Sequence, residues 1–278
     1  LLDGKKVAQY VYERMKPAER ERTYKPFNHV YQSDGKEFLT KGPGGRYTHH
    51  RGIYFGFSKC AVKDKKGKAQ NVDTWHCKRG YQTHEKFIDL EGGKENAVQH
   101  SEIAWRTDDG GIFATESRKL TFSHRDDGSL QVDFESKLST TQDRIGLDGD
   151  PQHAGFQFRA SNEVASETGK QTYYVRPKDG KDAEGKTKNW PGNKDMKDLL
   201  WKGQSVVVGG KRYFTLYLDH PSNPKPSFYS ERDYGRFGSY FKTEVTPSKP
   251  LTVKYRLVIK QGERTADECA VLSKEFLK

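Results

Sequence analysis

Residues 112–138 read IFATESRKLTFSHRDDGSLQVDFESKL, two alternating runs of apolar and polar residues separated by Asp126-Asp127-Gly128. An alternation with a period of two places every second side chain on the same face of an extended strand. Asp-Gly is a sequence typical of tight turns between antiparallel strands. The stretch therefore predicts a hairpin with strands over residues 112–122 and 130–138.

Similar runs lie on both sides of this hairpin and are separated by turns rich in glycine, proline and aspartate. Only residues 268–277 suggest a helix; residues 19–22 are interpreted as a charged linker and residues 166–197 as a long polar excursion. No alternation of strands with helices is present, so we expect an all-β fold: a large antiparallel β-sandwich with few short helices, formed by residues 1–278 as a single domain. The further strands are expected at residues 4–15, 27–31, 53–58, 100–105, 152–160, 172–175, 211–218 and 251–260.

The composition limits the classes of partner. Hydrophobic residues make up 32% of the chain, but 15 tyrosines, 15 phenylalanines and four tryptophans supply large side chains for a core. The net charge of +11 favours anionic partners. We expect no nucleic-acid partner, because zinc-finger, helix-turn-helix and aromatic RNA-binding patterns are absent. No run approaches the roughly 20 apolar residues that span a bilayer, so no membrane partner is expected.

The three cysteines, Cys60, Cys77 and Cys269, are odd in number and lack the spacing of metal ligands. They argue against a disulfide framework and against a zinc-finger type of site. Two alternatives remain for Cys60 and Cys77, which flank a basic loop: one disulfide bridge, or two free buried thiols.

The stretch YTHHRGIYFGF at residues 47–57 carries the first candidate functional residues. A glycine- and proline-rich turn precedes it, and an alternating aromatic strand begins at Ile53. His49, His50 and Arg51 are therefore expected where a loop enters a core strand, a frequent position for functional side chains.

Histidine, carboxylate and arginine recur together at other junctions between loops and strands. Histidine suits proton transfer near neutral pH, and arginine suits bidentate binding of carboxylate or sulfate groups. For each residue alone a structural role is the alternative; Trp75 fits a core position, and His76 and His124 are interpreted as ordinary surface residues. The candidates are His84, Trp75, Asp150, His153, Asp219, His220, Asn223, Arg232 and Tyr234.

Six segments in order, HHRG (49–52), VDTWH (72–76), GDPQHAGF (149–156), DHPSN (219–223), RDYG (232–235) and YRL (255–257), give the chain a family resemblance. The series resembles the soluble bacterial family named methane oxygenase PmoA-like. That family is similar in length and strand pattern to galactose-mutarotase-like supersandwich proteins. Because such folds host sugar epimerases, polysaccharide lyases and glycoside hydrolases, the resemblance implies a carbohydrate-active protein, without specifying a reaction.

These observations lead to a first hypothesis: an enzyme, of the lyase, hydrolase or epimerase type, that acts on an acidic glycan. His50 or His153 is expected to act as general acid or base, with His220 as a further catalytic candidate. Asp150 or Asp219 would be the partner carboxylate. The residues expected to bind the substrate are His49, Arg51, Trp75, His84, Asn223, Arg232 and Tyr234.

Two alternatives stand beside that hypothesis. The first is a non-catalytic glycan-binding module. The second is a metal site built from His49, His50, His153 and His220, ranked last because adjacent residues on a strand point to opposite faces. We therefore expect no metal and no other cofactor. The glycan hypothesis and the absent initiator methionine favour a secreted or periplasmic location; the sequence makes no prediction of oligomeric state.

Overall fold

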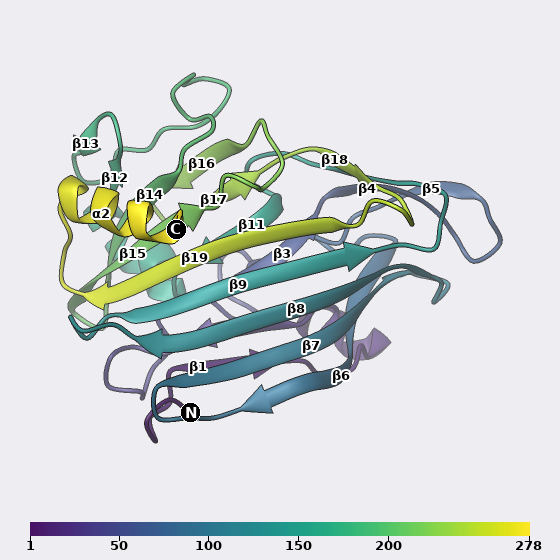
Figure 1. Cartoon of the computed structure of the whole chain (residues 1–278), viewed down its shortest axis with the longest axis horizontal. Coiled ribbons are helices and arrows are strands. Elements are labelled where there is room, and N and C mark those ends of the chain that lie inside the picture. The colour runs from purple at the N-terminus through teal and green to yellow at the C-terminus, as the bar shows by residue number, and fades with distance from the viewer.

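The computed structural model describes residues 1–278, and three antiparallel sheets dominate it (Figure 1). The expected all-β sandwich is confirmed. The nine-stranded sheet has the order β13-β12-β14-β15-β19-β9-β8-β7-β6, the six-stranded sheet β1-β2-β3-β11-β17-β16, and the four-stranded sheet β18-β10-β4-β5. The strands are β1 (Ala8–Val11), β2 (Phe27–Val30), β3 (Ile53–Phe57), β4 (Lys59–Lys63), β5 (Ala69–Val72), β6 (Gly80–Glu91), β7 (Asn96–Thr107), β8 (Ile112–His124), β9 (Leu130–Ser139), β10 (Ile145–Asp148), β11 (Ala154–Arg159), β12 (Tyr173–Arg176), β13 (Gly180–Lys181), β14 (Trp201–Val208), β15 (Lys211–Asp219), β16 (Phe228–Arg232), β17 (Arg236–Tyr240), β18 (Thr243–Val245) and β19 (Leu251–Gln261).

The helical elements are few and short. None of them is long and apolar enough to cross a membrane. The longest of them begins with the capping box of Thr265 and Glu268; it covers Ala266–Phe276, two residues earlier at its start than the predicted 268–277. They are η1 (Pro17–Glu19), α1 (Arg20–Thr23), the single π-turn η2 (Val164–Thr168), η3 (Gly169–Gln171) and α2 (Ala266–Phe276).

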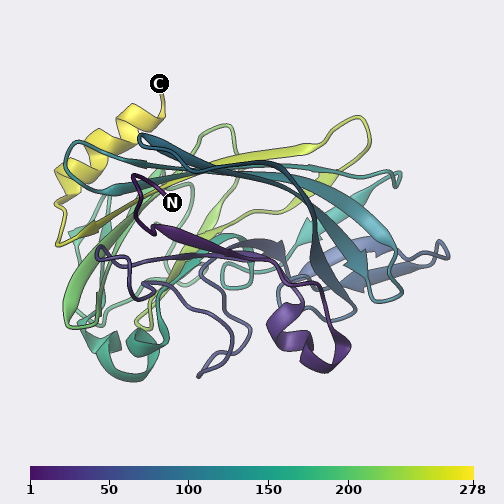
Figure 2. The ribbon, with the colours of Figure 1, turned by 90° about the horizontal axis from the view of Figure 1, so that it is seen from below.

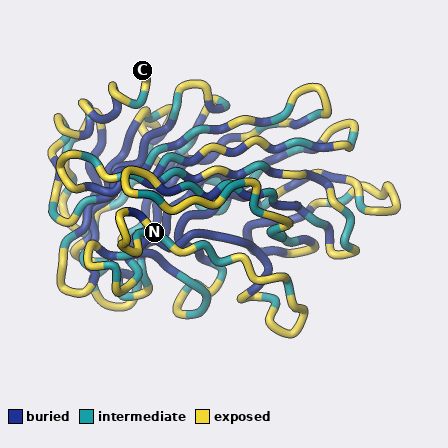
Figure 3. The backbone as a smooth tube through the Cα atoms, turned by 60° about the horizontal axis from the view of Figure 1, so that its bottom comes forward, coloured by how far each residue is buried: buried dark blue, intermediate teal, exposed yellow.

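The nine-stranded and six-stranded sheets face each other and enclose the main core (Figure 2). Aromatic rings fill the space between them. The ring of Phe134 in β9 lies 4.3 Å from that of Phe156 in β11, and Phe156 lies 4.7 Å from Tyr255 in β19. Burial follows the strands and exposure follows the turns (Figure 3). A core rich in phenylalanine and tyrosine compensates for the modest aliphatic content.

The predicted hairpin is confirmed: β8 and β9 pair from Thr115 with Ser139 to His124 with Leu130. Other predictions need correction. The first strand covers only Ala8–Val11, and the expected charged linker at residues 19–22 lies within the helical segments η1 and α1. No strand was predicted at β14. Every residue of β14 except Val207 is buried, so the sequence carries no alternation between a core face and a solvent face.

All three cysteines are buried free thiols. Of the two alternatives for Cys60 and Cys77, the structure therefore contains two free thiols and not a disulfide bridge. Cys60 Sγ lies 3.7 Å from the carbonyl oxygen of Phe57, and Cys77 Sγ lies 3.3 Å from that of Thr74. Burial raises the pKa of both thiols to about 12, which makes them poor nucleophiles near neutral pH.

The six-stranded sheet has an unusual second face. Phe156 and Phe158 of β11 point into the core, so the alternate residues Gln157 and Arg159 point outward. These outward side chains are nevertheless buried, with exposed fractions of 0% and 1%. A polar sheet face covered by loops is the position at which the histidine-bearing segments meet.

Gly155, in β11, is predicted to be intolerant of a side chain. Its φ angle is +78°, and a Cβ atom would lie 2.1 Å from the carbonyl oxygen of Ser239. We expect Gly155→Ala to lower the free energy of unfolding by more than the roughly 1–3 kcal/mol of backbone strain alone. The matched control is Gly180→Ala, where φ is +66° and no atom lies within 4 Å. Urea unfolding of both variants checks this, and equal losses would contradict the clash.

His29, in β2, predicts a pH-dependent stability. Burial lowers its pKa from 6.5 to about 4, with a hydrogen bond to Thr40 opposing the shift and the charges of Arg51 and Lys41 adding to it. Because the folded pKa is depressed, the unfolded chain binds a proton below pH 6.5 that the folded chain does not yet bind. Stability from this group is therefore complete above pH 6.5 and is lost as the pH falls towards 4.

We expect His29→Gln to flatten the dependence of the unfolding free energy on pH within that window, by up to about 1 kcal/mol per pH unit. Urea unfolding above pH 6.5 and between pH 6.5 and 4 measures the difference. Parallel curves for the two proteins would show that His29 is not the group that titrates.

Candidate functional site

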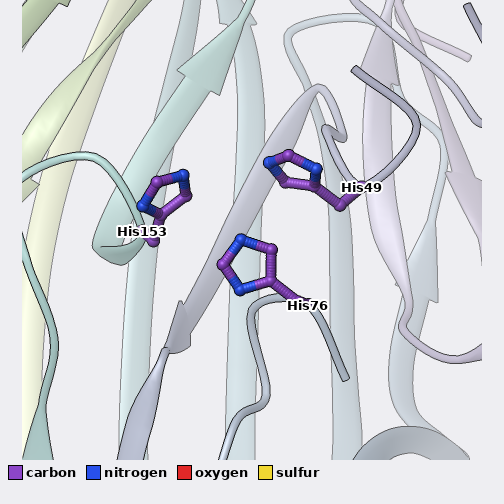
Figure 4. A group of neighbouring side chains, drawn as sticks. All are labelled: His49, His76 and His153. Carbon is purple, nitrogen blue, oxygen red and sulfur yellow. The ribbon is translucent and has the colours of Figure 1, made fainter. Parts of the chain in front are cut away.

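Three histidines from separate loops lie together over the outer face of the six-stranded sheet (Figure 4). His49 precedes β3, His76 follows β5 and His153 precedes β11. One ring nitrogen of each histidine lies within 4.8 Å of a ring nitrogen of each of the other two. The ring centroids lie 4.6 Å apart for His49 and His76 and 4.8 Å for His76 and His153. We call these residues the three-histidine cluster.

Two of these imidazoles are oriented by a carboxylate three residues earlier in the chain. Nδ1 of His76 lies 2.8 Å from Asp73, and Nδ1 of His153 lies 3.1 Å from Asp150. Each aspartate also accepts backbone amides of its own turn, such as that of Gln152 at 2.8 Å. The pattern Asp-x-x-His thus builds the same local structure twice and leaves Nε2 of each ring available.

The surroundings of His49 and His50 favour neutral imidazoles. Burial, with the nearby charges of His76 and Lys25, lowers the pKa of His49 to about 3. Burial and the charge of Arg159 also lower the pKa of His50. For Asp150, burial raises the pKa, but the hydrogen bond and charge of His153, the amide of Gln152 and the charge of Arg236 together outweigh burial, and the pKa lies below its usual value. A neutral ring such as that of His49 is suited to accept a proton or to bind a cation.

Three arginines form a row across neighbouring strands beside the cluster. Arg159 in β11 lies directly opposite Arg236 in β17, and Arg236 lies opposite Arg232 in β16. Arg159 and Arg236 are each 1% exposed, and no carboxylate forms an ion pair with any of the three. Their bonds go to neutral oxygens, such as that of Gln157 at 2.8 Å from Arg159. We call this set the arginine row.

Arg236 also has a buried Nε without a partner, as does Arg159. Burial lowers the pKa of Arg236 to about 10, and the neighbouring charge of Arg232 contributes to this shift. The row is thus a concentration of positive charge without an ion-paired carboxylate, and Asp150 is the acidic group whose charge acts on Arg159 and Arg236.

Aromatic side chains complete the surroundings of the cluster. Tyr47 stacks on His50 with ring centroids 5.0 Å apart, and it lies 4.4 Å from Tyr234. Trp75 is buried against Tyr54, and its indole Nε1 has no hydrogen-bond partner. The tyrosines are partly exposed, whereas Trp75 is 2% exposed and holds a core position beside the site.

The structure brings together seven of the residues predicted from sequence: His49, His50, Trp75, Asp150, His153, Arg232 and Tyr234. Arg51 lies next to them but is turned away. Its guanidinium donates to the carbonyl oxygens of Thr48, His50 and Glu21, so it fixes the loop that carries the histidines.

Four predicted residues lie elsewhere, because they belong to strands or loops of the nine-stranded sheet. His84 in β6 packs edge-on or tilted among Tyr10, Tyr12 and Phe87 and lines a separate cavity of about 700 Å³. His220 follows β15 and packs against Phe276 of α2. The expectation that all the histidine junctions converge is therefore corrected: His84 and His220 are not part of this site.

The carboxylate of Asp219 is already occupied. It accepts hydrogen bonds from Asn223 at 2.8 Å and Tyr229 at 2.5 Å, and it pairs with Lys225 at 3.2 Å. Asn223 in turn bonds the backbone of Lys254. Both residues fix the turn after β15 and so have a structural role, with side chains rather than backbone amides as the donors to Asp219.

His76 is the functional candidate that sequence reasoning missed. It was interpreted as a surface residue, yet it lies between His49 and His153. A signal was present: Asp-x-x-His occurs twice in the chain, at Asp73–His76 and Asp150–His153, and nowhere else.

The fold and site define an all-β sandwich with a polar, cation-rich sheet face beneath a histidine cluster. Over residues 1–274 the chain matches a family described as "Family of unknown function (DUF6807)", and it belongs to that family. The PmoA-like name expected from the sequence is not part of this description. No curated protein matches the chain.

Among solved structures, a protein named as a polysaccharide lyase is similar at a TM-score of 0.36 and 8% sequence identity. The likeness covers 92% of this chain but 33% of the lyase, so this chain spans about a third of that protein's length. A likeness this low carries no information about the function of this chain.

Proposed function

We propose that the protein is an enzyme that acts on a carbohydrate bearing anionic groups, with the arginine row binding the anion and the three-histidine cluster carrying the reaction. The observation that supports this most directly is the arginine row. Like charges placed directly opposite each other destabilise a sheet. A bound anion would relieve that repulsion, so the row is suited to a ligand rather than to stability alone.

The chemistry of the row favours carboxylate or sulfate groups. A guanidinium offers a planar set of donors that matches two oxygens of such a group. Arg232 is only partly buried, and Arg236 retains an unpartnered Nε. Arg159 also has an unpartnered Nε, but it and Arg236 are buried, so Arg232 is the member of the row that a ligand reaches first.

The reactive groups are the imidazole–carboxylate pairs at His76 and His153. A carboxylate on Nδ1 fixes the tautomer that leaves Nε2 free. A free Nε2 beside a bound anion is positioned to move a proton from carbon or from water, or to hold an ion that does so. The partly exposed rings of Tyr47 and Tyr234 lie next to His50, and Tyr234 also lies under Arg236; they give flat apolar faces, in keeping with a sugar ring as the substrate.

Paired substrates test the proposal. Acidic oligosaccharides and their carboxyl-reduced counterparts are incubated with the protein, and products are separated by chromatography. We expect turnover of an acidic member, with kcat/KM at least about tenfold lower for its neutral counterpart. Arg232→Gln should reduce the rate for the acidic substrate and leave the neutral one unchanged.

Other results would point elsewhere. Binding of acidic glycans without any product would identify a non-catalytic binding module. Equal turnover of acidic and neutral members, or equal effects of Arg232→Gln on both, would remove the arginine row from substrate recognition.

A further inference from the structure

We propose that the three-histidine cluster binds one divalent transition-metal ion of the zinc type, through nitrogens of His49, His76 and His153. The three rings lie around one space and come from three different loops (Figure 4). Imidazole nitrogen suits zinc, copper, iron and nickel, and three histidines with an open fourth position form a common catalytic zinc site.

The hydrogen bonds behind the ligands match those of metal-binding histidines. His76 and His153 each place Nδ1 against an aspartate, at 2.8 and 3.1 Å, so that Nε2 remains for an ion. A carboxylate on the far nitrogen orients a ligating imidazole and increases its basicity. His49 adds a second observation, because its buried Nε2 has no hydrogen-bond partner. A buried nitrogen without a partner is costly unless a ligand satisfies it.

Binding of one ion requires the three imidazole nitrogens to move slightly closer together. A tetrahedral ion with bonds of about 2.0–2.1 Å holds neighbouring ligand nitrogens about 3.3–3.5 Å apart. The nitrogens here lie within 4.8 Å of one another, so small rotations of the side chains bring them to that distance. All three residues are partly exposed, which leaves the remaining coordination position open to water or substrate.

The local charges balance a dication only in part. Asp73 and Asp150 place two negative charges behind the ligands. Lys25 and Arg159 lie near enough to affect His49 and oppose a further positive charge. We therefore expect the affinity for the ion to depend strongly on both carboxylates.

The proposed ion would serve the proposed function. The inference rests on that function only in that both use the three-histidine cluster. A bound ion would polarise a substrate oxygen or a water molecule next to the arginine row. The test reads metal content and metal spectra, so its outcome does not depend on finding the carbohydrate.

The experiment measures metal in the full chain purified without chelator, by mass spectrometry, and titrates chelator-treated protein with Co²⁺ while recording its visible absorption. We expect about one ion per chain and an absorption typical of a low-symmetry Co²⁺ site. His76→Ala should weaken binding at least about tenfold, and Asp73→Asn, which keeps the ligand, by about 10- to 100-fold. His124→Ala, which removes an exposed imidazole outside the cluster, is the matched control and should bind as the original protein does.

Failure of the metal inference and failure of the proposed function are distinguishable. Less than a tenth of an ion per chain in the saturated protein, or full binding by both His76→Ala and Asp73→Asn, would overturn the metal site. An equal loss in His124→Ala would also overturn it by showing non-specific binding to surface histidines. A metal-replete protein that turns over no acidic carbohydrate would refute the enzyme proposal alone.

Discussion

Replacing Glu116 with alanine is expected to lower the free energy of unfolding by about 3–5 kcal/mol. Glu116, in β8, is 0% exposed and pairs with Arg118 at 2.8 Å. It also accepts hydrogen bonds from the indole of Trp105 and the hydroxyl of Ser136, both at 2.8 Å. Removing the carboxylate leaves a buried guanidinium and two buried donors without partners, and each costs free energy that the folded state cannot recover from water.

Loss of the Glu116–Arg118 ion pair should loosen the strand beside the three-histidine cluster as well as the core. Arg118 also lies 3.4 Å from the carbonyl oxygen of Phe55, in β3, so the ion pair connects the nine-stranded sheet to the strand that follows His49. Urea unfolding with two spectroscopic probes measures the loss. The matched control is Glu244→Ala, which breaks the exposed pair with Arg144 and should change stability by less than about 1 kcal/mol. Comparable losses for the two variants would contradict this account of the buried pair.

Replacing His153 with glutamine is expected to lower kcat/KM by about 10²- to 10⁴-fold on the acidic carbohydrate identified by the paired screen. The imidazole is held by Asp150 at 3.1 Å and lies 4.8 Å from His76, centroid to centroid. Glutamine retains a hydrogen-bonding group but has no ring nitrogen with which to take a proton or hold an ion. His153 is partly exposed, so the fold should tolerate the change.

The measurement separates kcat from KM under conditions where both proteins are shown to be folded by circular dichroism. A loss confined mainly to kcat is expected if His153 acts in the reaction rather than in substrate binding. His124→Gln serves as control and should retain full activity. Unchanged kcat in His153→Gln would exclude this residue from the chemistry.

Much of the fold was predictable because a strand with one buried face alternates in sequence. The hairpin of β8 and β9 has that pattern, and both its strands and its turn were predicted. β14 lacks it, because both of its faces are covered and its residues are buried almost throughout. The N-terminal strand was overestimated, since alternation continued beyond the four residues that pair with β2.

The site was predictable only in part, because sequence order does not reveal which strand ends share a face. Adjacent β3 and β11 run antiparallel, and Ala154 pairs with Phe57, so the entrances of the two strands lie at opposite ends. The histidines before them meet because their loops fold over the outer face of the sheet. His220 follows a strand of the other large sheet, and it lacks the aspartate three residues earlier that orients His153.

The arginine row could also not be predicted from single motifs. Arg232 was predicted as an individual residue, but its alignment with Arg236 and Arg159 depends on the pairing register of three strands. A shift of one residue in any strand would turn its arginine to the opposite face. Register is set by core packing and turns throughout the sheet, which local patterns do not encode.

The dispersal of the site along the chain also has a consequence during synthesis. His49 and His76 emerge early, whereas the strand that carries Arg236 is made near the end. Joining such remote segments costs chain entropy and is slow relative to hairpin formation. Under the proposed function, a nascent or truncated polypeptide that stops before β17 would lack Arg236 and would be inactive, and activity would first appear when β17 pairs with β11 and β16.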